Sequence, residues 1–147
     1  MTASPRAVEL VTAAAEAAAE KLSRHIQAFD VSDRLAITDA FLLTSGSNDR
    51  QVRSIVDAVE ERLRLLDAKP IRREGQQECR WVLLDYGEVV VHVQHAEERT
   101  YYSLDRLWKD CPELSLPLAD GSGGLDGDGD GEDDIDLREG SAAAGGS

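Results

Sequence analysis

The chain contains few cysteines and no long apolar segment. Its two cysteines among 147 residues, Cys79 and Cys111, lie far apart and show no Cys-x-x-Cys spacing. We therefore expect free thiols and a reducing, cytoplasmic compartment. No apolar run approaches the length that spans a bilayer, and the N-terminus lacks the basic segment and apolar core of a signal peptide. The sequence thus predicts neither a membrane protein nor an exported one.

Basic residues are also scarce. The chain has 16 lysines and arginines against 29 aspartates and glutamates, which gives a formal net charge of −13. Nine acidic residues and one basic residue lie in 118–147, so the rest of the chain is only mildly acidic. Electrostatic binding to naked nucleic acid requires clustered lysine and arginine, so we expect no direct sequence-specific nucleic acid binding. An acidic surface suits a basic protein partner, because complementary charge speeds encounter.

Glycine is rare outside the C-terminal segment. Nine of the 12 glycines fall in 118–147, and this segment has almost no aromatic or β-branched residues. Such a composition cannot bury enough apolar surface to fold, so we predict an acidic, glycine-rich, disordered tail over 118–147. Residues 1–117 are predicted to form a single domain. The three glycines in this domain, Gly46, Gly75 and Gly87, each lie at a predicted turn.

Apolar periodicity and end signals predict three helices. Ser4-Pro5 is typical of a cap followed by proline at the first helical position, and apolar residues recur at helical spacing up to Leu22 and Ile26. Asn48 and Gln51 have the spacing of a capping box. We expect helices over 5–25, from 49 to before Pro70, and over 97–110.

Short apolar runs predict the strands, which cover 28–31, 39–45, 71–73, 80–84 and 89–93. The short link between the last two strands predicts an antiparallel hairpin. The strands at 39–45 and 89–93 are apolar enough to be covered on both faces. Helices and strands interleave, so we expect an α/β fold with a mixed sheet packed with helices.

One signal would fit an enzyme. Gly46-Ser47 lies between a buried strand and a helix, where free backbone N–H groups can bind an anion and where nucleotidyltransferases carry a similar pair. That chemistry needs two or three carboxylates around metal ions, and the hairpin offers only Asp85, with Glu88 across a turn. We therefore favour an ordinary turn and helix cap over a nucleotide-binding or nucleotidyltransferase site.

Two further patterns could suggest a metal site. His92 and His95 are three apart on a predicted strand, which places them on opposite faces, so they cannot chelate one ion together. The segment 126–131 resembles the start of a calcium-binding loop, but Leu137 occupies the position that requires a bidentate glutamate. We predict no metal site.

The few aromatic residues gather in the hairpin and the last predicted helix. Trp81 shares a strand face with Leu83 and Asp85, while Tyr101 and Trp108 share a helix face. Tryptophan and tyrosine serve both in cores and as anchors of protein interfaces. Periodicity alone leaves Trp81 open between these two roles and favours the core for Trp108.

Three stretches of the chain resemble the ribosomal silencing factors, also called the Iojap-like family. They are 28–31 with 37–39, 45–57, and 81–93 followed by Tyr101, Tyr102, Leu104 and 106–108. The stretch Trp81–Val93 is the most specific of the three, and the resemblance covers about residues 6–110. It implies a nucleotidyltransferase-like fold without the catalytic acids, no enzymatic activity and no cofactor.

The resemblance also implies a function. Members of this family bind a protein on the intersubunit face of the large ribosomal subunit and sterically block association with the small subunit, which represses translation under nutrient limitation. The family interface uses the tryptophan that matches Trp81. We extend the predicted partner-binding site to neighbouring residues, with the helix residues as weaker candidates: Leu83, Asp85, Glu78, Tyr101, Tyr102 and Leu107.

An exposed apolar patch also favours self-association, so a homodimer of the free protein is expected from the resemblance. Two alternatives remain at this point. One is a nucleotide-binding or nucleotidyltransferase enzyme that uses Gly46-Ser47. The other is a dimeric scaffold with a different role for its acidic surface.

Overall fold

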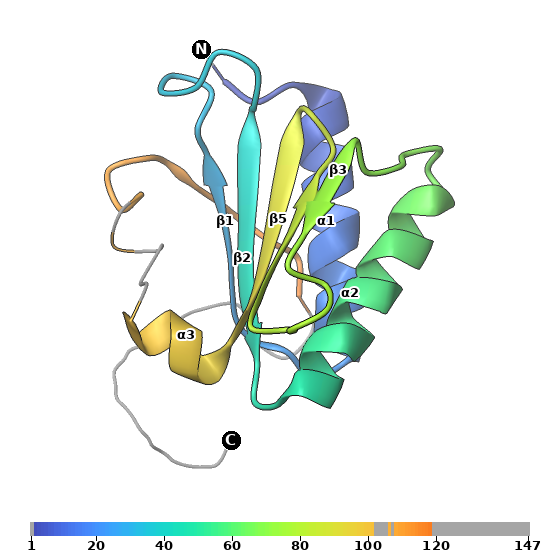
Figure 1. Cartoon of the computed structure of the whole chain (residues 1–147). Coiled ribbons are helices and arrows are strands. Elements are labelled where there is room, and N and C mark those ends of the chain that lie inside the picture. Colours follow the sequence, from blue (N-terminus) through green and yellow to red (C-terminus); the bar gives the residue numbers. More distant parts are fainter. Residues whose placement is uncertain (1, 102–105, 107, 119–147) are drawn as a thin grey trace.

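A six-stranded mixed sheet with two long helices on one face forms the protein (Figure 1). The computed structural model describes residues 2–101, 106 and 108–118. The elements in chain order are α1 (Pro5–Glu20), β1 (Arg24–Asp30), β2 (Ala40–Gly46), α2 (Asp49–Arg64), β3 (Arg72–Glu74), β4 (Trp81–Asp85), β5 (Val89–His95), α3 (Ala96–Tyr101) and β6 (Glu113–Leu114). The expected α/β fold is confirmed.

The strands are ordered β3-β4-β5-β2-β1-β6 across the sheet. The central strands β2 and β5 run parallel, and the other four neighbouring pairs of described strands are antiparallel. Both central strands are buried along their whole length, as expected for strands covered on two faces. The β4–β5 hairpin is antiparallel as predicted, with Leu83 opposite His92.

Helix α1 begins as the sequence predicts but ends earlier. The Ser4 side chain accepts a hydrogen bond from the Ala7 N–H at 3.0 Å, and Pro5 occupies the first turn. The prediction that the helix reaches residue 25 is wrong, because Leu22 adopts a left-handed conformation with φ of 60° and is 79% exposed. Ile26, which fits the helical spacing, instead lies in β1 and is 1% exposed.

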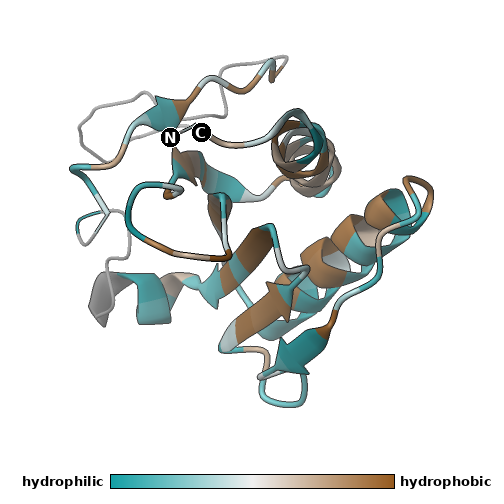
Figure 2. Ribbon diagram, turned by 90° about the horizontal axis from the view of Figure 1, so that it is seen from above, coloured by the Kyte–Doolittle hydropathy of each residue, from teal (hydrophilic) through white to brown (hydrophobic). Residues whose placement is uncertain are grey.

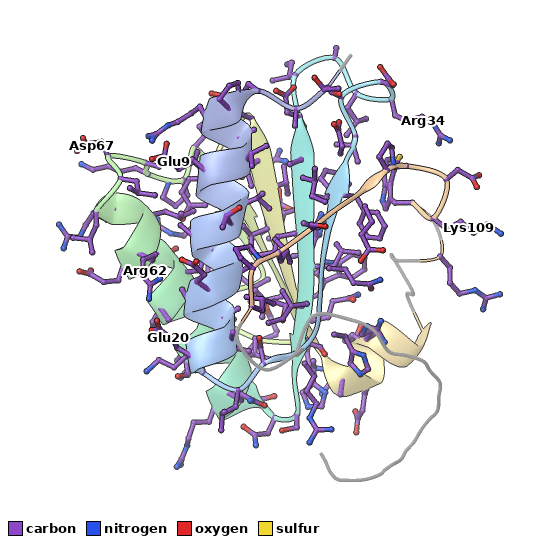
Figure 3. The ribbon with its side chains drawn as sticks, turned by 180° about the vertical axis from the view of Figure 1, so that it is seen from behind. Glu9, Glu20, Arg34, Arg62, Asp67 and Lys109 are labelled. Carbon is purple, nitrogen blue, oxygen red and sulfur yellow. The ribbon has the colours of Figure 1, made fainter. Side chains whose placement is uncertain are left out.

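The two long helices, α1 and α2, contact each other through buried small side chains and through an ion pair at the surface. Small side chains on α1, among them Ala14, Ala15 and Ala18, are fully buried and let the helix approach the sheet and α2 closely. At the surface, Arg62 of α2 pairs with Glu20 of α1 at 2.6 Å. Figure 3 labels both residues on their neighbouring helices. The helix pair therefore forms one continuous cover for this face.

The start of α2 is fixed by a variant of the predicted capping box. The Asn48 side chain accepts from the Gln51 N–H at 2.9 Å. The Gln51 side-chain oxygen returns to the N–H of Ser47 at 2.7 Å, one residue before the cap. Its amide nitrogen donates to the carbonyls of Lys21 and Leu22. Gln51 thus ties the end of α1 to the start of α2.

Hydrophobic residues form two clusters on opposite faces of the sheet. The larger cluster lies between the sheet and the helices α1 and α2, and Figure 2 shows hydrophobic residues along the strands and along α2. The smaller cluster lies on the other face, where Leu35, Leu83 and Trp108 pack against its buried members, Phe29, Val31, Phe41, Leu43, Val90 and Cys111. Trp108 therefore contributes to a core, as its periodicity suggested.

The end of the chain departs from the prediction. Helix α3 is described from Ala96 to Tyr101, and Arg106 is also helical. Residues 108–110 form a turn, so the predicted helix over 97–110 is wrong at its last three residues. The short strand β6 was not predicted and pairs with Ala28 and Phe29 of β1. The predicted tail from residue 119 onward lies outside the described residues. Within the described part of the chain, no helix is long and apolar enough to cross a membrane.

Candidate functional site

The face of the sheet opposite α1 and α2 carries the predicted site residues of β4. Val82 and Leu84 are buried beneath the helices, while Trp81, Leu83 and Asp85 are only partly buried on the other side. Strand alternation therefore places these three side chains together, as the sequence predicted. We call this side of the sheet the helix-free face, because neither of the two long helices, α1 and α2, covers it. Helix α3 lies on the same side, away from α1 and α2 (Figure 2).

A row of four aromatic rings crosses the helix-free face from β4 to the segment after α3. Trp81 and His92 lie with ring centroids 6.2 Å apart, and Phe41 meets His92 edge-on at 5.1 Å. Phe41 meets Trp108 edge-on at 4.9 Å. Such edge-to-face contacts stabilise a fixed arrangement of rings beyond simple burial. The aromatic row, defined as Trp81, His92, Phe41 and Trp108, thus joins the partly exposed Trp81 to the smaller core.

His92 is the polar member of this row. The Trp81 Nε1–H donates a hydrogen bond to His92 Nδ1 at 3.2 Å. Burial lowers the pKa of His92 to about 4, so the ring is neutral at neutral pH. The other ring nitrogen, Nε2, is buried and has no hydrogen-bond partner within the part of the chain that the structure describes. Sequence reasoning did not identify His92 as a site residue.

Asp85 has a structural task as well as a place on the helix-free face. Its Oδ1 accepts from the Gly87 N–H at 2.8 Å, and its Oδ2 lies 3.7 Å from an Arg72 nitrogen. The first contact stabilises the turn of the β4–β5 hairpin, where Gly87 has a φ of 86°. One oxygen of the Asp85 carboxylate therefore stabilises the hairpin turn, and the Asp85 side chain is 25% exposed.

The remaining predicted residues are less well placed. Glu78 is exposed in the loop before β4. Tyr101 lies in α3, but its side chain is outside the described structure. Tyr102 and Leu107 are wholly outside the described residues. The structure therefore brings Trp81, Leu83 and Asp85 together and leaves the helix residues as predictions.

Arg80 holds the start of α3 beside Trp81, and sequence reasoning missed it. Its guanidinium lies 2.8 Å from Glu97 and 3.2 Å from Glu98, and these hydrogen bonds raise the pKa of Arg80. The Arg80 carbonyl also accepts from the His95 N–H at 2.7 Å. The paired acids at 97 and 98, which the sequence explains by the helix dipole, thus also anchor α3 to β4.

The geometry disfavours a nucleotidyltransferase site at Gly46-Ser47. The Ser47 N–H and Oγ both donate to the Gln51 side-chain oxygen, at 2.7 and 2.8 Å. Gly46 lies opposite His95, whereas Asp85 lies opposite Val90, five residues away along β5. At about 3.3 Å per residue this separates the two by roughly 16 Å along the sheet. The carboxylate and the turn therefore do not converge on one site.

His92 and His95, which the sequence offered as possible metal ligands, lie on different sides of the sheet. His92 lies on the helix-free face, whereas His95 Nε2 is 4.0 Å from Asp49 at the start of α2. They point to opposite sides, as predicted. Among the described residues, no group of three or more histidine, cysteine, aspartate or glutamate side chains could hold a metal ion.

Comparison with known proteins gives a consistent picture. Residues 4–138 match the family described as "Ribosomal silencing factor during starvation". The chain is 36% identical over 108 residues to the ribosomal silencing factor RsfS of Halalkalibacterium halodurans, covering 74% of this chain and 92% of that protein. It is 39% identical over 103 residues to RsfS of Bacillus subtilis, covering 70% and 87%.

A solved structure agrees with the sequence relatives. A crystal structure of a protein from Bacillus halodurans superimposes with a TM-score of 0.65 and 34% sequence identity, covering 74% of this chain and 99% of that one. The family match spans most of the chain and includes the whole of β4 and β5. The chain therefore belongs to the family of ribosomal silencing factors, RsfS, which are regulators of translation.

Proposed function

We propose that this protein binds a ribosomal protein on the intersubunit face of the large ribosomal subunit and sterically blocks association with the small subunit. Translation is thereby repressed under nutrient limitation, in the cytoplasm, where the ribosomes are. The family match supports the silencing role. The mechanism requires no catalysis and no cofactor, because an occupied surface is enough to prevent joining.

One observation supports the helix-free face as the docking surface. Trp81 and Leu83 remain partly exposed there, although their strand neighbours Val82 and Leu84 are fully buried on the helix side. A tryptophan that is half-covered and held on a rigid strand is a typical anchor of a protein interface. A standard interface needs about 800 Å² per partner, so we expect the partner to contact both this face and the edge of α3.

The charge around this face suits a basic partner. Glu78 is exposed beside β4, and Asp85 keeps part of its carboxylate accessible. Glu97 and Glu98 lie at the start of α3, where Arg80 compensates only part of their charge. Ribosomal proteins that contact RNA are rich in basic residues, so complementary charge favours encounter with one of them.

Cosedimentation with purified ribosomal subunits tests this proposal. We expect the wild-type protein to sediment with the large subunit only, and to lower the fraction of subunits that join when magnesium is raised. Trp81→Ala should weaken binding by about 2 kcal/mol or more if Trp81 is the anchor. Leu65→Ala is the matched control, because Leu65 is 64% exposed at the end of α2 on the helix side.

Three results would contradict the proposal: binding to the small subunit, equal loss of binding in the two variants, or unhindered joining with the factor bound. Circular dichroism of each variant checks that the fold is retained.

Self-association of the free protein is a further part of the proposal. A homodimer that buries the helix-free face would have to dissociate before the ribosome could bind. Sedimentation velocity over a wide concentration range should then show a dimer that Trp81→Ala weakens. A wild-type protein that stays monomeric at high concentration would remove the dimer without affecting the proposed ribosome binding.

A further inference from the structure

The hydrogen bond between Trp81 and His92 is the most specific contact on the helix-free face. The indole Nε1–H of Trp81 on β4 meets His92 Nδ1 on the neighbouring strand β5 at 3.2 Å. The two residues are not directly opposite, since Trp81 is paired with Gln94 and His92 with Leu83. The indole therefore leans diagonally across the strand pair toward the imidazole.

This contact defines the tautomer of His92. An Nδ1 that accepts a hydrogen bond carries no proton, so the proton of the neutral ring is on Nε2. Burial keeps the ring neutral, with a pKa lowered to about 4. Both features make Nδ1 an acceptor throughout the neutral pH range.

His92 is a poor choice for stability alone. The residue is 8% exposed, and its Nε2–H has no partner within the described part of the chain. Buried donors without partners destabilise a fold, and an apolar side chain of similar size would fill the same space without this penalty. The presence of histidine here thus indicates that the hydrogen bond accepted by Nδ1 has a function other than stability.

The acceptor is held rigidly. Phe41 packs edge-on against the His92 ring at 5.1 Å, and Trp108 packs edge-on against Phe41 at 4.9 Å. Because β5 is a central strand buried along its whole length, close packing restrains both the backbone and the ring of His92. Trp81 is only partly buried, so packing alone restrains its indole less.

We propose that His92 is a positioning residue for partner binding, whose Nδ1 holds the Trp81 indole in the orientation in which it docks on the large ribosomal subunit. This inference rests on the proposed function. Fixing the indole before docking removes the entropy that would otherwise be lost on binding.

Two substitutions separate this role from a structural one. His92→Leu removes the acceptor and also the Nε2–H donor, whereas His92→Asn keeps an oxygen at the place of Nδ1. We expect His92→Leu to weaken binding to the large subunit by about threefold to tenfold. Its thermal midpoint should be unchanged or higher, because water can accept from the partly exposed indole. His92→Asn should restore most of the affinity.

A double-mutant cycle tests whether the effect passes through Trp81. In a Trp81→Phe background no indole N–H exists, so His92→Leu should cause no further loss of affinity. In the free protein, nitrogen NMR of His92 should show a protonated Nε2, and the Trp81 indole resonance should shift in His92→Leu. Both measurements use the full chain.

The possible failures are distinguishable. If the wild-type protein does not bind the large subunit, the proposed function fails and this inference fails with it. If the wild type binds and His92→Leu binds equally well, the inference is overturned and the proposed function stands. Equal losses for His92→Leu with and without the Trp81 indole, or a loss that follows lowered stability, would also overturn it.

Discussion

The backbone of Gly75 lies directly against the carbonyl group of Trp81. A Cβ at position 75 would overlap the Trp81 carbonyl oxygen, and Gly75 has a φ of 82°, a conformation that side chains rarely adopt. The contact lies where the chain turns from β3 into the loop before β4. Glycine at 75 therefore sets the position of the strand that carries the proposed anchor.

Gly75→Ala should destabilise the protein for two reasons, the positive φ and the clash with Trp81. We expect a loss of about 2 kcal/mol or more in the free energy of unfolding, measured by urea denaturation. Gly87→Ala is the matched control, because its φ is 86° but its Cβ would meet only the flexible end of Ile71. It should cost about 1 kcal/mol. Equal losses in the two variants would show that the clash adds nothing.

Asp30 fastens the start of the chain to the sheet. Its Oδ2 accepts from the Ala3 N–H at 2.9 Å, and its Oδ1 accepts from the N–H and hydroxyl of Ser32 at 3.0 and 2.6 Å. Burial acts to raise the pKa of Asp30, but these hydrogen bonds outweigh it and leave the pKa lowered. The carboxylate is thus favoured in the folded protein.

Asp30→Ala should lower the free energy of unfolding by about 2 kcal/mol, because three donors lose a charged acceptor. Thermal and urea denaturation measure the change. Asp57→Ala is the control, an exposed acidic residue on α2 for which we expect a change within about 0.5 kcal/mol. If the two variants were equally stable, the hydrogen bonds of Asp30 would contribute nothing to the fold.

Gln51 acts as a clamp between the two long helices. Its oxygen accepts from Ser47, and its nitrogen donates to the carbonyls of Lys21 and Leu22. Gln51→Ala should cost about 1 kcal/mol of stability, since these contacts are exposed to solvent. Gln51→Glu keeps the acceptor but places a negative charge against two carbonyl oxygens, so it should cost at least as much. If Gln51→Glu were as stable as the wild type, the hydrogen bonds from the Gln51 amide nitrogen to Lys21 and Leu22 would contribute nothing to stability.

His92 makes the stability of the fold depend on pH. Its pKa is lowered by burial from 6.5 to about 4. Between these values the unfolded chain binds a proton that the folded chain does not. The free energy of unfolding therefore falls as the pH drops from about 6.5 to about 4, by about 3 kcal/mol at most. Above about pH 7 the contribution is constant.

His92→Leu isolates this effect, because every other titrating group is kept. The difference in the free energy of unfolding between the variant and the wild type should grow as the pH falls through this window. Urea denaturation at several pH values measures it. Parallel stability curves for the two proteins would contradict the buried, neutral state of His92.

Much of the fold was predictable because its signals are local. The spacing of Val52, Ile55 and Val59 gave the buried face of α2, and the Asn48 cap gave its start. Alternation along β4 placed Trp81, Leu83 and Asp85 on one face, and the structure confirms this. These patterns follow from the periods of the helix and the strand, which the order of residues alone encodes.

The sequence-based prediction was wrong where an apolar pattern continued past the end of a helix into the next strand. Leu22 and Ile26 continue the apolar spacing of α1, but the left-handed turn at Leu22 ends the helix and Ile26 is buried from a strand. The strand β6 has two residues and exists only through its pairing with β1. Neither feature has a signal within a short window of sequence.

The sequence alone determined the family, the alternation that places Trp81 on the same side of β4 as Leu83 and Asp85, and the absence of paired catalytic acids from that strand. Only the tertiary structure decided what Trp81 contacts. The register of β4 on β5 sets His92 beside the indole, and the parallel pairing of β5 with β2 sets Phe41 behind it. Periodicity fixes which side of an element a residue faces, whereas its neighbours depend on long-range strand register, which no local pattern contains.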